Sequence, residues 1–518
     1  MKHHISKLLS LVTALLLFGC GNGGSSSETN PNRIIISNYE VGIYDPHLIS
    51  PIFTKFSEPL TYSFNGTHIA IEDGQVFGLR ADTKTVVKAT APSGAETTFS
   101  VFVIEDEYEA QTPQEVSEGW MNDISVAPVN GIDEDYPLGI DVSMVKQIYD
   151  NGGQYYNEDG IAQDVYQILK NHGVNYIRIR LWNEPYNYVT NEDDEVVKVP
   201  YGGGINDLAT DLAIAKDARR AGLKILLDFH YSDFWADPSN QVIPKAWKDL
   251  TSPKAVEDAL YTFTKTTLEA FEAIGALPSM VQIGNETTPG MMTQYPGPTN
   301  QNLTGNSPYY ITQKTGLSAS IAGSSGSANF LRYIKAGIKA VNDVDDDILT
   351  MIHLARGLSN TTGIINYFNQ FTDVDYDVIG LSTYTYYHGS PVTIAAGARA
   401  VSQAFPDKKI TFAETAYAYT LANHLQTSNI FGTSQIESGY PVTVQGQASL
   451  LRDIIAANAN LANGFGVFYW EGCWLPVRGA GWADANTKSS WSNQALFSYD
   501  GKALPSLNVF NLVQGKTL

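Results

Sequence analysis

The chain has 518 residues, and its 54 acidic and 33 basic side chains give a formal net charge of −21. That charge argues against nucleic acid and polyanionic substrates, because both require basic surfaces, and we expect a neutral partner. A hydrophobic content of 43% and an aromatic content of 11% indicate a globular protein with many rings suited to stacking on sugars. With only two cysteines, Cys20 and Cys473, a disulfide framework is excluded.

Residues 1–20 have the features of a bacterial lipoprotein signal peptide. A short basic region precedes an apolar run from Leu8 to Phe18, which is too short to span a bilayer. The run ends in a Leu-Phe-Gly-Cys sequence that resembles a lipobox, which implies cleavage before Cys20 and acylation of its thiol. An ordinary secretory signal is the alternative. We expect a monomer at the cell envelope, on the outer membrane facing the exterior, whose only membrane contact is this anchor.

The next segments are predicted to be a tether, a small β-domain and a linker. Residues 21–32 are rich in Gly and Ser, as in flexible tethers. Residues 33–106 contain short apolar or alternating runs separated by turn signals, which favour a β-sandwich. The stretch EDGQVFGLRADTKTVVKATAPSGAETTFSVFVIE resembles a bacterial immunoglobulin-like module, which implies a spacer. Residues 107–136 are acidic and aperiodic, and they indicate a linker.

Residues 137–518 alternate apolar strand-like runs with amphipathic helical segments, the pattern of βα units around a parallel sheet. The eight expected strands are 138–141, 176–182, 224–229, 280–284, 349–352, 376–381, 409–413 and 466–470. Eight strands predict a (β/α)₈ barrel, so the fold class is α/β. An open doubly wound sheet is the alternative, but no Gly-rich nucleotide fingerprint follows any strand.

Two glutamates stand at the ends of expected strands, where barrels carry their catalytic groups. Glu286 follows the fourth strand and Glu414 the seventh, so the two carboxyl groups should face each other across the barrel mouth. Opposed carboxyl groups suit glycoside hydrolysis, in which one protonates the leaving oxygen and the other attacks or activates water. The alternative is that either glutamate pairs with Arg178 or Arg180 in a structural network. The competing carboxylates at strand ends are Glu184, Glu471 and Asp233, expected at the rim or in supporting positions.

A series of motifs then resembles glycoside hydrolase family 53, the endo-β-1,4-galactanases, from about residue 137 to residue 510. In chain order these are GIDVSMV, YYNEDG, GVNYIRIRLWNEP, GLKILLDFHYSDFWADP, VQIGNE, VIGLSTYTYYHG, AETAYAYT, GVFYWE and NQALFSYDGKALPSL. The resemblance implies endo-acting hydrolysis of β-1,4-galactosidic bonds in galactan or type I arabinogalactan side chains of pectin. The implied mechanism is a retaining double displacement with Glu286 as acid/base and Glu414 as nucleophile.

The resemblance also implies a set of substrate-binding residues. Arg180, His230, Asn285, Tyr384 and Trp470 are expected to line the bond-cleaving subsite, with Trp235 as a stacking platform for a galactosyl ring. We add Asp233 as a substrate-binding candidate. Arg180 is favoured over Arg178 to orient Glu414, because it lies nearer the end of its strand. His353 and His388 are further residues that could reach the cleft.

The chain departs from the family pattern at two places. Some family members bind calcium in an acidic loop after the seventh strand, but residues 421–429 contain no carboxylate, so we expect no metal there and no cofactor. After Trp470 and Glu471 the chain continues with Gly472 and Cys473, which could alter distal subsites. The alternatives are another retaining barrel β-glycosidase, such as a mannanase or β-galactosidase, and a non-catalytic surface glycan-binding protein. The sequence shows no Ser-His-Asp arrangement of an esterase or protease.

Overall fold

The computed structural model describes residues 32–41, 47–49, 51–72, 74–78, 83–103, 124–190, 196–296, 310–312, 317–321, 324–424, 427–482 and 488–516. The chain divides into two compact units, residues 1–107 and 108–518. The predicted signal peptide with Cys20 lies outside the described residues, as does nearly all of the tether. No helix within the described ranges is long and apolar enough to cross a membrane.

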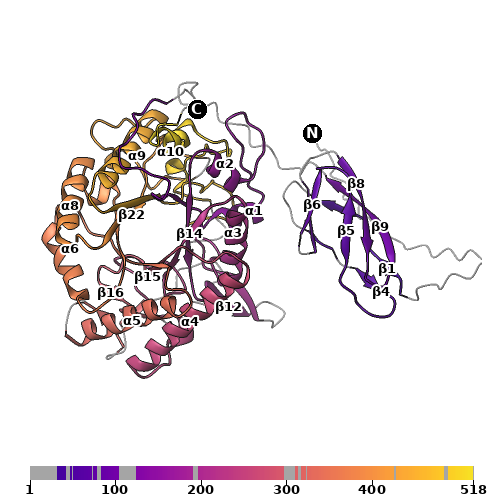
Figure 1. The fold of residues 1–518 in the computed structure, drawn as a ribbon, viewed down its shortest axis with the longest axis horizontal. Helices are drawn as coiled ribbons and strands as arrows, with labels where there is room; N and C mark the ends of the chain where they lie inside the picture. Colours follow the sequence, from indigo (N-terminus) through magenta and orange to yellow (C-terminus); the bar gives the residue numbers. More distant parts are fainter. Residues whose placement is uncertain are drawn as a thin grey trace, which may run out of the picture. The chain divides into compact units, whose positions relative to one another are not determined.

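The first unit consists of short strands in three sheets (Figure 1). The strands are β1 (Ile34–Ile35), β2 (Tyr39–Val41), β3 (His47–Leu48), β4 (Ile52–Phe53), β5 (Thr61–Phe64), β6 (Ile69–Glu72), β7 (Gln75–Gly78), β8 (Thr83–Thr90) and β9 (Glu96–Val103). Their order is β2-β9-β8-β5 in one sheet, β3-β7-β6 in the second and β1-β4 in the third. Alternate residues of β8 and β9 are buried, and the opposed pair Val87 and Phe99 lies in the core of this unit. The region is therefore β-rich, as expected.

The second unit is a closed barrel of eight parallel strands, which confirms the predicted fold class (Figure 1). The strands are β10 (Leu138–Asp141), β11 (Tyr176–Leu181), β14 (Lys224–Phe229), β15 (Met280–Ile283), β20 (Leu349–Leu354), β21 (Val378–Ser382), β22 (Lys409–Thr415) and β23 (Gly464–Tyr469). Pairing of β10 with β23 closes the ring. Three two-stranded antiparallel sheets belong to the same unit: β12 (Tyr186–Thr190) with β13 (Val196–Pro200), β16 (Gly290–Met291) with β19 (Ala319–Ser320), and β17 (Gln294–Pro296) with β18 (Tyr310–Thr312).

Helices surround the barrel (Figure 1). They are α1 (Val145–Asp150), α2 (Val165–Asn171), α3 (Leu208–Arg220), α4 (Pro253–Ala273), α5 (Ser324–Asn342), α6 (Thr361–Phe368), α7 (Thr385–His388), α8 (Pro391–Ala404), α9 (Val444–Ala459) and α10 (Val509–Leu512). Short 3-10 helices occupy Lys245–Trp247, Asn369–Phe371, Thr433–Gln435, Ser492–Gln494 and Pro505–Asn508. Several helices start at a capping side chain; Asp207 accepts from the backbone of Thr210, and Ser390 from that of Thr393.

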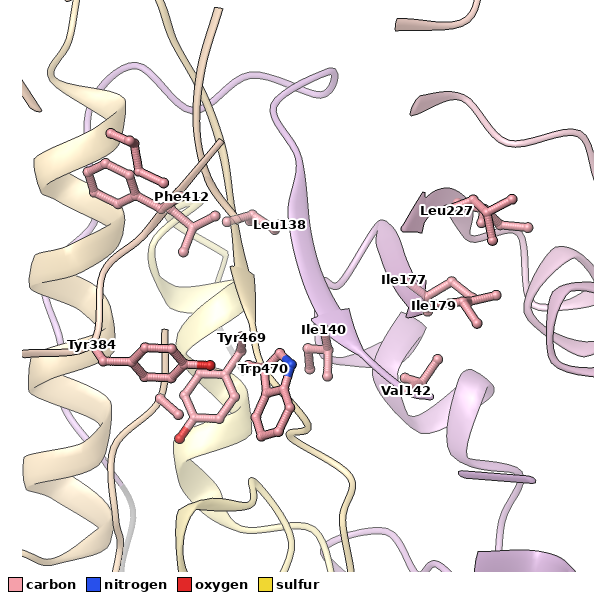
Figure 2. Close-up of a cluster of buried hydrophobic side chains, with 14 of the residues drawn as sticks. Leu138, Ile140, Val142, Ile177, Ile179, Leu227, Tyr384, Phe412, Tyr469 and Trp470 are labelled. Atoms are coloured by element: carbon pink, nitrogen blue, oxygen red, sulfur yellow. The ribbon is translucent and has the colours of Figure 1, made fainter. Parts of the chain in front are cut away.

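Successive residues of each barrel strand point alternately outward, into an apolar layer, and inward, into the barrel interior. Residues such as Ile177, Ile179 and Leu227 belong to the core between strands and helices (Figure 2). The inward-pointing residues fill the barrel. Those nearer the amino-terminal ends of the strands form the apolar cluster Tyr176, Leu226, Met280, Met351, Val378, Ala413 and Phe468. Two residues further along four of these strands stand the buried polar side chains Arg178, Asp228, Gln282 and His353. The candidate site rests on this polar layer.

Residues 124–136, the described part of the predicted linker, pack against the barrel unit. Ile124, Val129 and Tyr136 are buried in the barrel unit's core. The Val129 amide donates to the carbonyl of Val513 at 2.9 Å, and the Tyr136 hydroxyl donates to Asn458 at 2.7 Å. We call this segment the strap; it forms no helix or strand, and a few buried residues hold it against the barrel. Because only these isolated residues are buried, its apolar residues follow no period.

Candidate active site

The carboxyl group of Glu286 stands just beyond β15, on a sharply turned backbone. Gly284 has φ of 85° and Glu286 itself has φ of 43°, a conformation that costs an L-residue free energy and is concentrated at functional sites. The Glu286 side chain is buried, and its Oε1 accepts a hydrogen bond of 2.6 Å from the Ser382 hydroxyl on β21. The strained turn therefore presents this carboxyl group at the barrel mouth, where the sequence placed it.

Glu414 lies on β22 and is held by two partners. Its Oε1 is 2.9 Å from Nη2 of Arg178, and its Oε2 accepts from the Tyr384 hydroxyl at 2.9 Å. The preference for Arg180 as the orienting arginine is therefore wrong. Arg180 points to Glu471 and to the carbonyl of Gly203 instead. Both arginines face the barrel interior, but Arg178 lies one layer deeper, level with the carboxyl group of Glu414.

The two carboxyl groups lie close together. An oxygen of Glu286 and one of Glu414 are within 4.8 Å of each other, shorter than the separation of about 6.5–9.5 Å found in inverting glycosidases. Burial raises the pKa of both groups. For Glu286 the neighbouring Glu414 raises it further, whereas Arg178 and Tyr384 lower the pKa of Glu414. The pKa of Glu414 nevertheless stays raised, at about 7, and that of Glu286 is raised well above its usual value, so Glu414 gives up its proton first.

Arg178 is the centre of a buried network that the sequence left open. Its guanidinium donates to Asp141 at 2.9 Å, to Asp228 at 2.8 Å and to the Asn285 side-chain oxygen at 2.9 Å. Although burial raises it, Arg178 and His230 bring the pKa of Asp228 below its ordinary value. Asp141 and Asp228 are functional neighbours that sequence reasoning missed. Their signal was the parity they share with other inward-facing strand residues.

The structure places Asn285 next to Glu286 in the chain and His230 next to Asp228, with most of their polar atoms bonded to protein. The Asn285 amide nitrogen donates to the carbonyl of Ala236 at 2.7 Å. His230 Nδ1 accepts from Trp182 at 3.0 Å and from the Ala236 amide at 3.1 Å, and its Nε2 lies 3.1 Å from Asp228. These bonds fix the orientation of both side chains. Their contacts with a sugar stay a prediction.

Trp235 belongs to a larger tryptophan cluster that comprises Trp235, Trp470, Trp474, Trp482 and Trp491. The Trp482 ring lies nearly parallel to that of Trp235, with 5.0 Å between centroids and 18° between planes. On the other side of the cluster, Trp470 and Trp491 meet edge to face at 4.6 Å. The sequence analysis identified Trp235 and Trp470 only. The remaining three come from the segment after β23, whose path cannot be read from local pattern.

Arg180 supports this aromatic cluster. Its guanidinium carbon lies 4.4 Å from the Trp235 ring centre, and Glu471 binds the same guanidinium. A side chain at Gly203, which has φ of 72°, would come within 2.6 Å of the Trp235 ring, so glycine is required there. Burial raises the pKa of Glu471 to about 8, with Arg180 opposing the rise. Arg180, held by Glu471, thus packs against the tryptophan cluster. Neither residue bonds to Glu414 among the described contacts.

Four other predicted residues have structural positions of their own. Tyr384 donates to the nucleophile candidate, and burial raises its pKa well above the usual value, so it remains a donor. Asp233 is buried and accepts from the backbone amide of Lys245 at 2.7 Å, which braces the loop that carries Trp235. Burial raises its pKa to about 6. His388 accepts from the Tyr384 amide at 3.1 Å, and His353 lies behind Glu286.

Glu286, His353 and Glu414 could each offer one atom to a shared cation. However, Arg178 lies 2.9 Å from Glu414, and its charge opposes a second cation there. The donor set therefore fits acid-base chemistry better than metal binding. The expectation of no calcium in the loop 421–429 stays a prediction, since residues 425–426 lie outside the described ranges.

Comparison with known proteins now places this site in a family. Residues 137–510 match the family model of glycosyl hydrolase family 53. The chain belongs to this family. The family 53 chain is 35% identical over 431 residues to an endo-beta-1,4-galactanase of Bacillus subtilis, with 77% of this chain and 91% of the relative covered. It is 29% identical over 379 residues to an arabinogalactan endo-beta-1,4-galactanase of Cellvibrio japonicus, with coverage of 72% and 90%.

Solved structures agree with this family assignment. A GH53 catalytic domain of Ignisphaera aggregans matches with a TM-score of 0.64 and 38% identity, covering 75% of this chain and 99% of the other. A structure described as one of two fungal beta-1,4-galactanases matches with a TM-score of 0.56 and 25% identity, covering 72% and 98%. The recognition of a family 53 glycoside hydrolase from sequence motifs is confirmed.

Proposed function

We propose that this protein cleaves internal β-1,4-galactosidic bonds of galactan, including the type I arabinogalactan side chains of pectin, with retention of anomeric configuration. The observation that carries the proposal is the pair Glu286 and Glu414, whose oxygens lie within 4.8 Å of each other in differing surroundings. The galactanase names of the relatives support the substrate. The net charge of −21 and the tryptophan cluster fit a neutral polysaccharide.

In the first step Glu414 attacks the anomeric carbon while Glu286 protonates the departing glycosidic oxygen. Arg178 and Tyr384 hold the nucleophile's two oxygens in place, so the attacking lone pair is oriented before the substrate arrives. Burial keeps the proton on Glu286 until the leaving oxygen needs it. The glycosidic C–O bond breaks, a glycosyl ester forms on Glu414, and the leaving sugar departs with the proton.

In the second step the ionised Glu286 removes a proton from water, which attacks the anomeric carbon and releases Glu414. Formation of the ester removes the negative charge of Glu414, which lowers the proton affinity of Glu286 in the intermediate, because Glu414 raises the pKa of Glu286 when charged. Glu286 can therefore serve as acid in one step and base in the next. Two displacements at one carbon restore the original configuration.

Product release from linear β-1,4-galactan by a protein lacking residues 1–20 tests the proposal. Wild type should release short galacto-oligosaccharides, and the Glu286→Ala and Glu414→Ala variants should be nearly inactive. With sodium azide and an activated aryl β-galactobioside, Glu286→Ala should yield the β-azide and Glu414→Ala the α-azide, which separates the two roles. Release from mannan or xylan but not galactan would contradict the substrate, and silence on every glycan would favour a binding protein.

We also propose that residues 1–20 direct acylation of Cys20 at the cell envelope, and that the β-rich unit is an immunoglobulin-like spacer behind a monomeric enzyme. The lipobox-like sequence and the strand pattern of residues 33–106 support these proposals. A Cys20→Ser variant should lose labelled fatty acid and leave the membrane fraction. Light scattering of the protein lacking residues 1–20 should give one chain per particle. Retention of the variant in membranes would contradict the anchor.

A further inference from the structure

The carboxyl group of Glu286 is linked to two buried polar side chains that no step above uses. The Ser382 hydroxyl lies 2.6 Å from Oε1 of Glu286, and His353 Nε2 lies 2.9 Å from the same hydroxyl oxygen. Ser382 and His353 are both fully buried, on β21 and β20. The His353 ring also contacts the backbone of Glu286, whose amide donates to Nδ1 of the ring at 3.4 Å.

When Glu286 is ionised, its carboxylate sets the direction of the hydrogen bonds along this chain. A carboxylate can only accept, so the single Ser382 hydrogen is given to Oε1. The serine oxygen must then accept from His353, which places the ring hydrogen on Nε2 and leaves Nδ1 as an acceptor. Nδ1 then accepts from the Glu286 amide and from the Gln282 side-chain nitrogen at 3.1 Å, against the opposing contact of the Asn285 side-chain oxygen at 3.0 Å, which can only accept. Burial lowers the pKa of His353 well below its usual value, which keeps the ring neutral.

We propose that His353 and Ser382 are positioning residues for the acid/base carboxyl group, binding Oε1 in both protonation states so that Oε2 alone exchanges the proton with the glycosidic oxygen and with water. This inference rests on the proposed function of Glu286. Among the described residues, none donates a hydrogen bond to Oε2, which leaves that oxygen for the reaction. The neutral acid still accepts at Oε1 as a carbonyl oxygen, so the same bonds persist through both steps.

The Ser382 bond also bears on pH dependence. Charged or titratable groups face Glu286 from several elements: Glu414 on β22, Arg178 on β11, His353 on β20, Tyr384 beyond β21 and Asp237 beyond β14. Burial raises the pKa of Glu286 most, Glu414 and Asp237 raise it further, and the Ser382 bond and Arg178 lower it. Loss of the Ser382 hydroxyl should therefore move the alkaline limb of kcat/KM to higher pH, since it removes an interaction that favours the ionised form.

Leaving-group dependence separates positioning from general damage. For Ser382→Ala, kcat/KM for phenyl β-galactobioside should fall about tenfold or more, because this leaving group needs the acid. For the 2,4-dinitrophenyl substrate, which leaves without a proton, the fall should be less than about threefold. Ser382→Thr should restore most activity, and Ser382→Cys, a weak donor of similar size, should lie between. Equal losses on both substrates, or an unmoved alkaline limb, would overturn the proposal.

Two controls complete the experiment. Ser402 on α8 is also buried and donates its hydroxyl to Asn463, far along the chain from the site, so Ser402→Ala should leave the ratio of the two substrates unchanged. Nitrogen-15 NMR of labelled histidine, assigned with His353→Gln, should show a neutral Nε2–H ring; an Nδ1–H ring would overturn the proposal without any activity measurement. If the wild type is inactive on galactan but active on another aryl β-glycoside, only the proposed substrate is contradicted. The Ser382 variants would then be compared on phenyl and 2,4-dinitrophenyl forms of that glycoside.

Discussion

Arg178 and Glu414 form an ion pair inside the barrel, with 2.9 Å between Nη2 of the arginine and Oε1 of the glutamate. The same guanidinium binds Asp141 and Asp228 at 2.9 Å and 2.8 Å. One cation thus pairs with three buried carboxylates, among them Glu414, the proposed nucleophile. The geometry of the nucleophile and the stability of the barrel interior therefore depend on one side chain.

Replacement of Arg178 by lysine should lower kcat on galactan about 100-fold, the loss typical of removing one preorganised donor. Lysine is a point charge and cannot reach all three carboxylates with a planar fork. The acid limb of the pH profile should also move upward, because Arg178 lowers the pKa of Glu414. Arg332→Lys is the matched control, since that arginine pairs with Glu257 on the surface. Unchanged kcat in Arg178→Lys would refute the assignment.

Glu286→Gln should abolish hydrolysis while raising the melting temperature at alkaline pH. The pKa of Glu286 is raised by burial, so the folded state keeps a proton that the unfolded chain releases above about pH 4.3. Wild-type stability from this group is therefore full below that pH and declines as pH rises toward the folded pKa. Glutamine is neutral throughout and avoids the decline. Melting curves at pH 4 and pH 8 test this, with surface Glu257→Gln as control; equal shifts at both pH values would argue against the raised pKa.

Tyr384→Phe should reduce kcat about tenfold, because a hydrogen bond to a charged group contributes about 1.5–3 kcal/mol. The hydroxyl donates to Oε2 of Glu414 at 2.9 Å and favours its ionised form. Its loss should therefore also shift the acid limb of kcat/KM to higher pH. Tyr261→Phe, which removes a surface bond to Asp343, should change neither. A fall in kcat with an unmoved acid limb would assign Tyr384 to the substrate instead.

Trp482→Ala should raise KM for long galactan by about threefold to tenfold, the range expected from losing aromatic contacts of about 0.5–1.5 kcal/mol. The Trp482 ring is nearly parallel to those of Trp235 and Trp474, with 5.0 Å and 5.4 Å between ring centroids, so its removal disturbs the tryptophan cluster. Hydrolysis of an activated aryl galactoside should change less, because fewer of its sugar units contact the tryptophan cluster. Trp247→Phe, in the packing against Tyr231 and Phe263, should lower the melting temperature but leave KM unaltered.

The barrel and the two glutamates were predictable because both depend on local pattern. Alternating helix and strand periodicity marks eight βα units, and a polar residue after an apolar strand lies at the barrel mouth wherever the strand sits in the ring. Glu286 and Glu414 satisfy that rule, and they stand out from the competing carboxylates because their strands, the fourth and the seventh, face each other across the ring. The roles of the surrounding residues came from family resemblance, and the mutations above test them.

Tertiary structure alone decided which arginine orients Glu414. Arg178 and Arg180 share a strand face, but closing a barrel staggers neighbouring strands, and this stagger sets which layer of one strand meets which layer of the next. The Ser382–His353 chain arises in the same way, since it joins residues 29 positions apart on adjacent strands. The strap 124–136 and the three further tryptophans depend on irregular segments. Sequence thus determined the strand order and the reactive groups, whereas their partners depended on side chains brought together by closure, which no local period encodes.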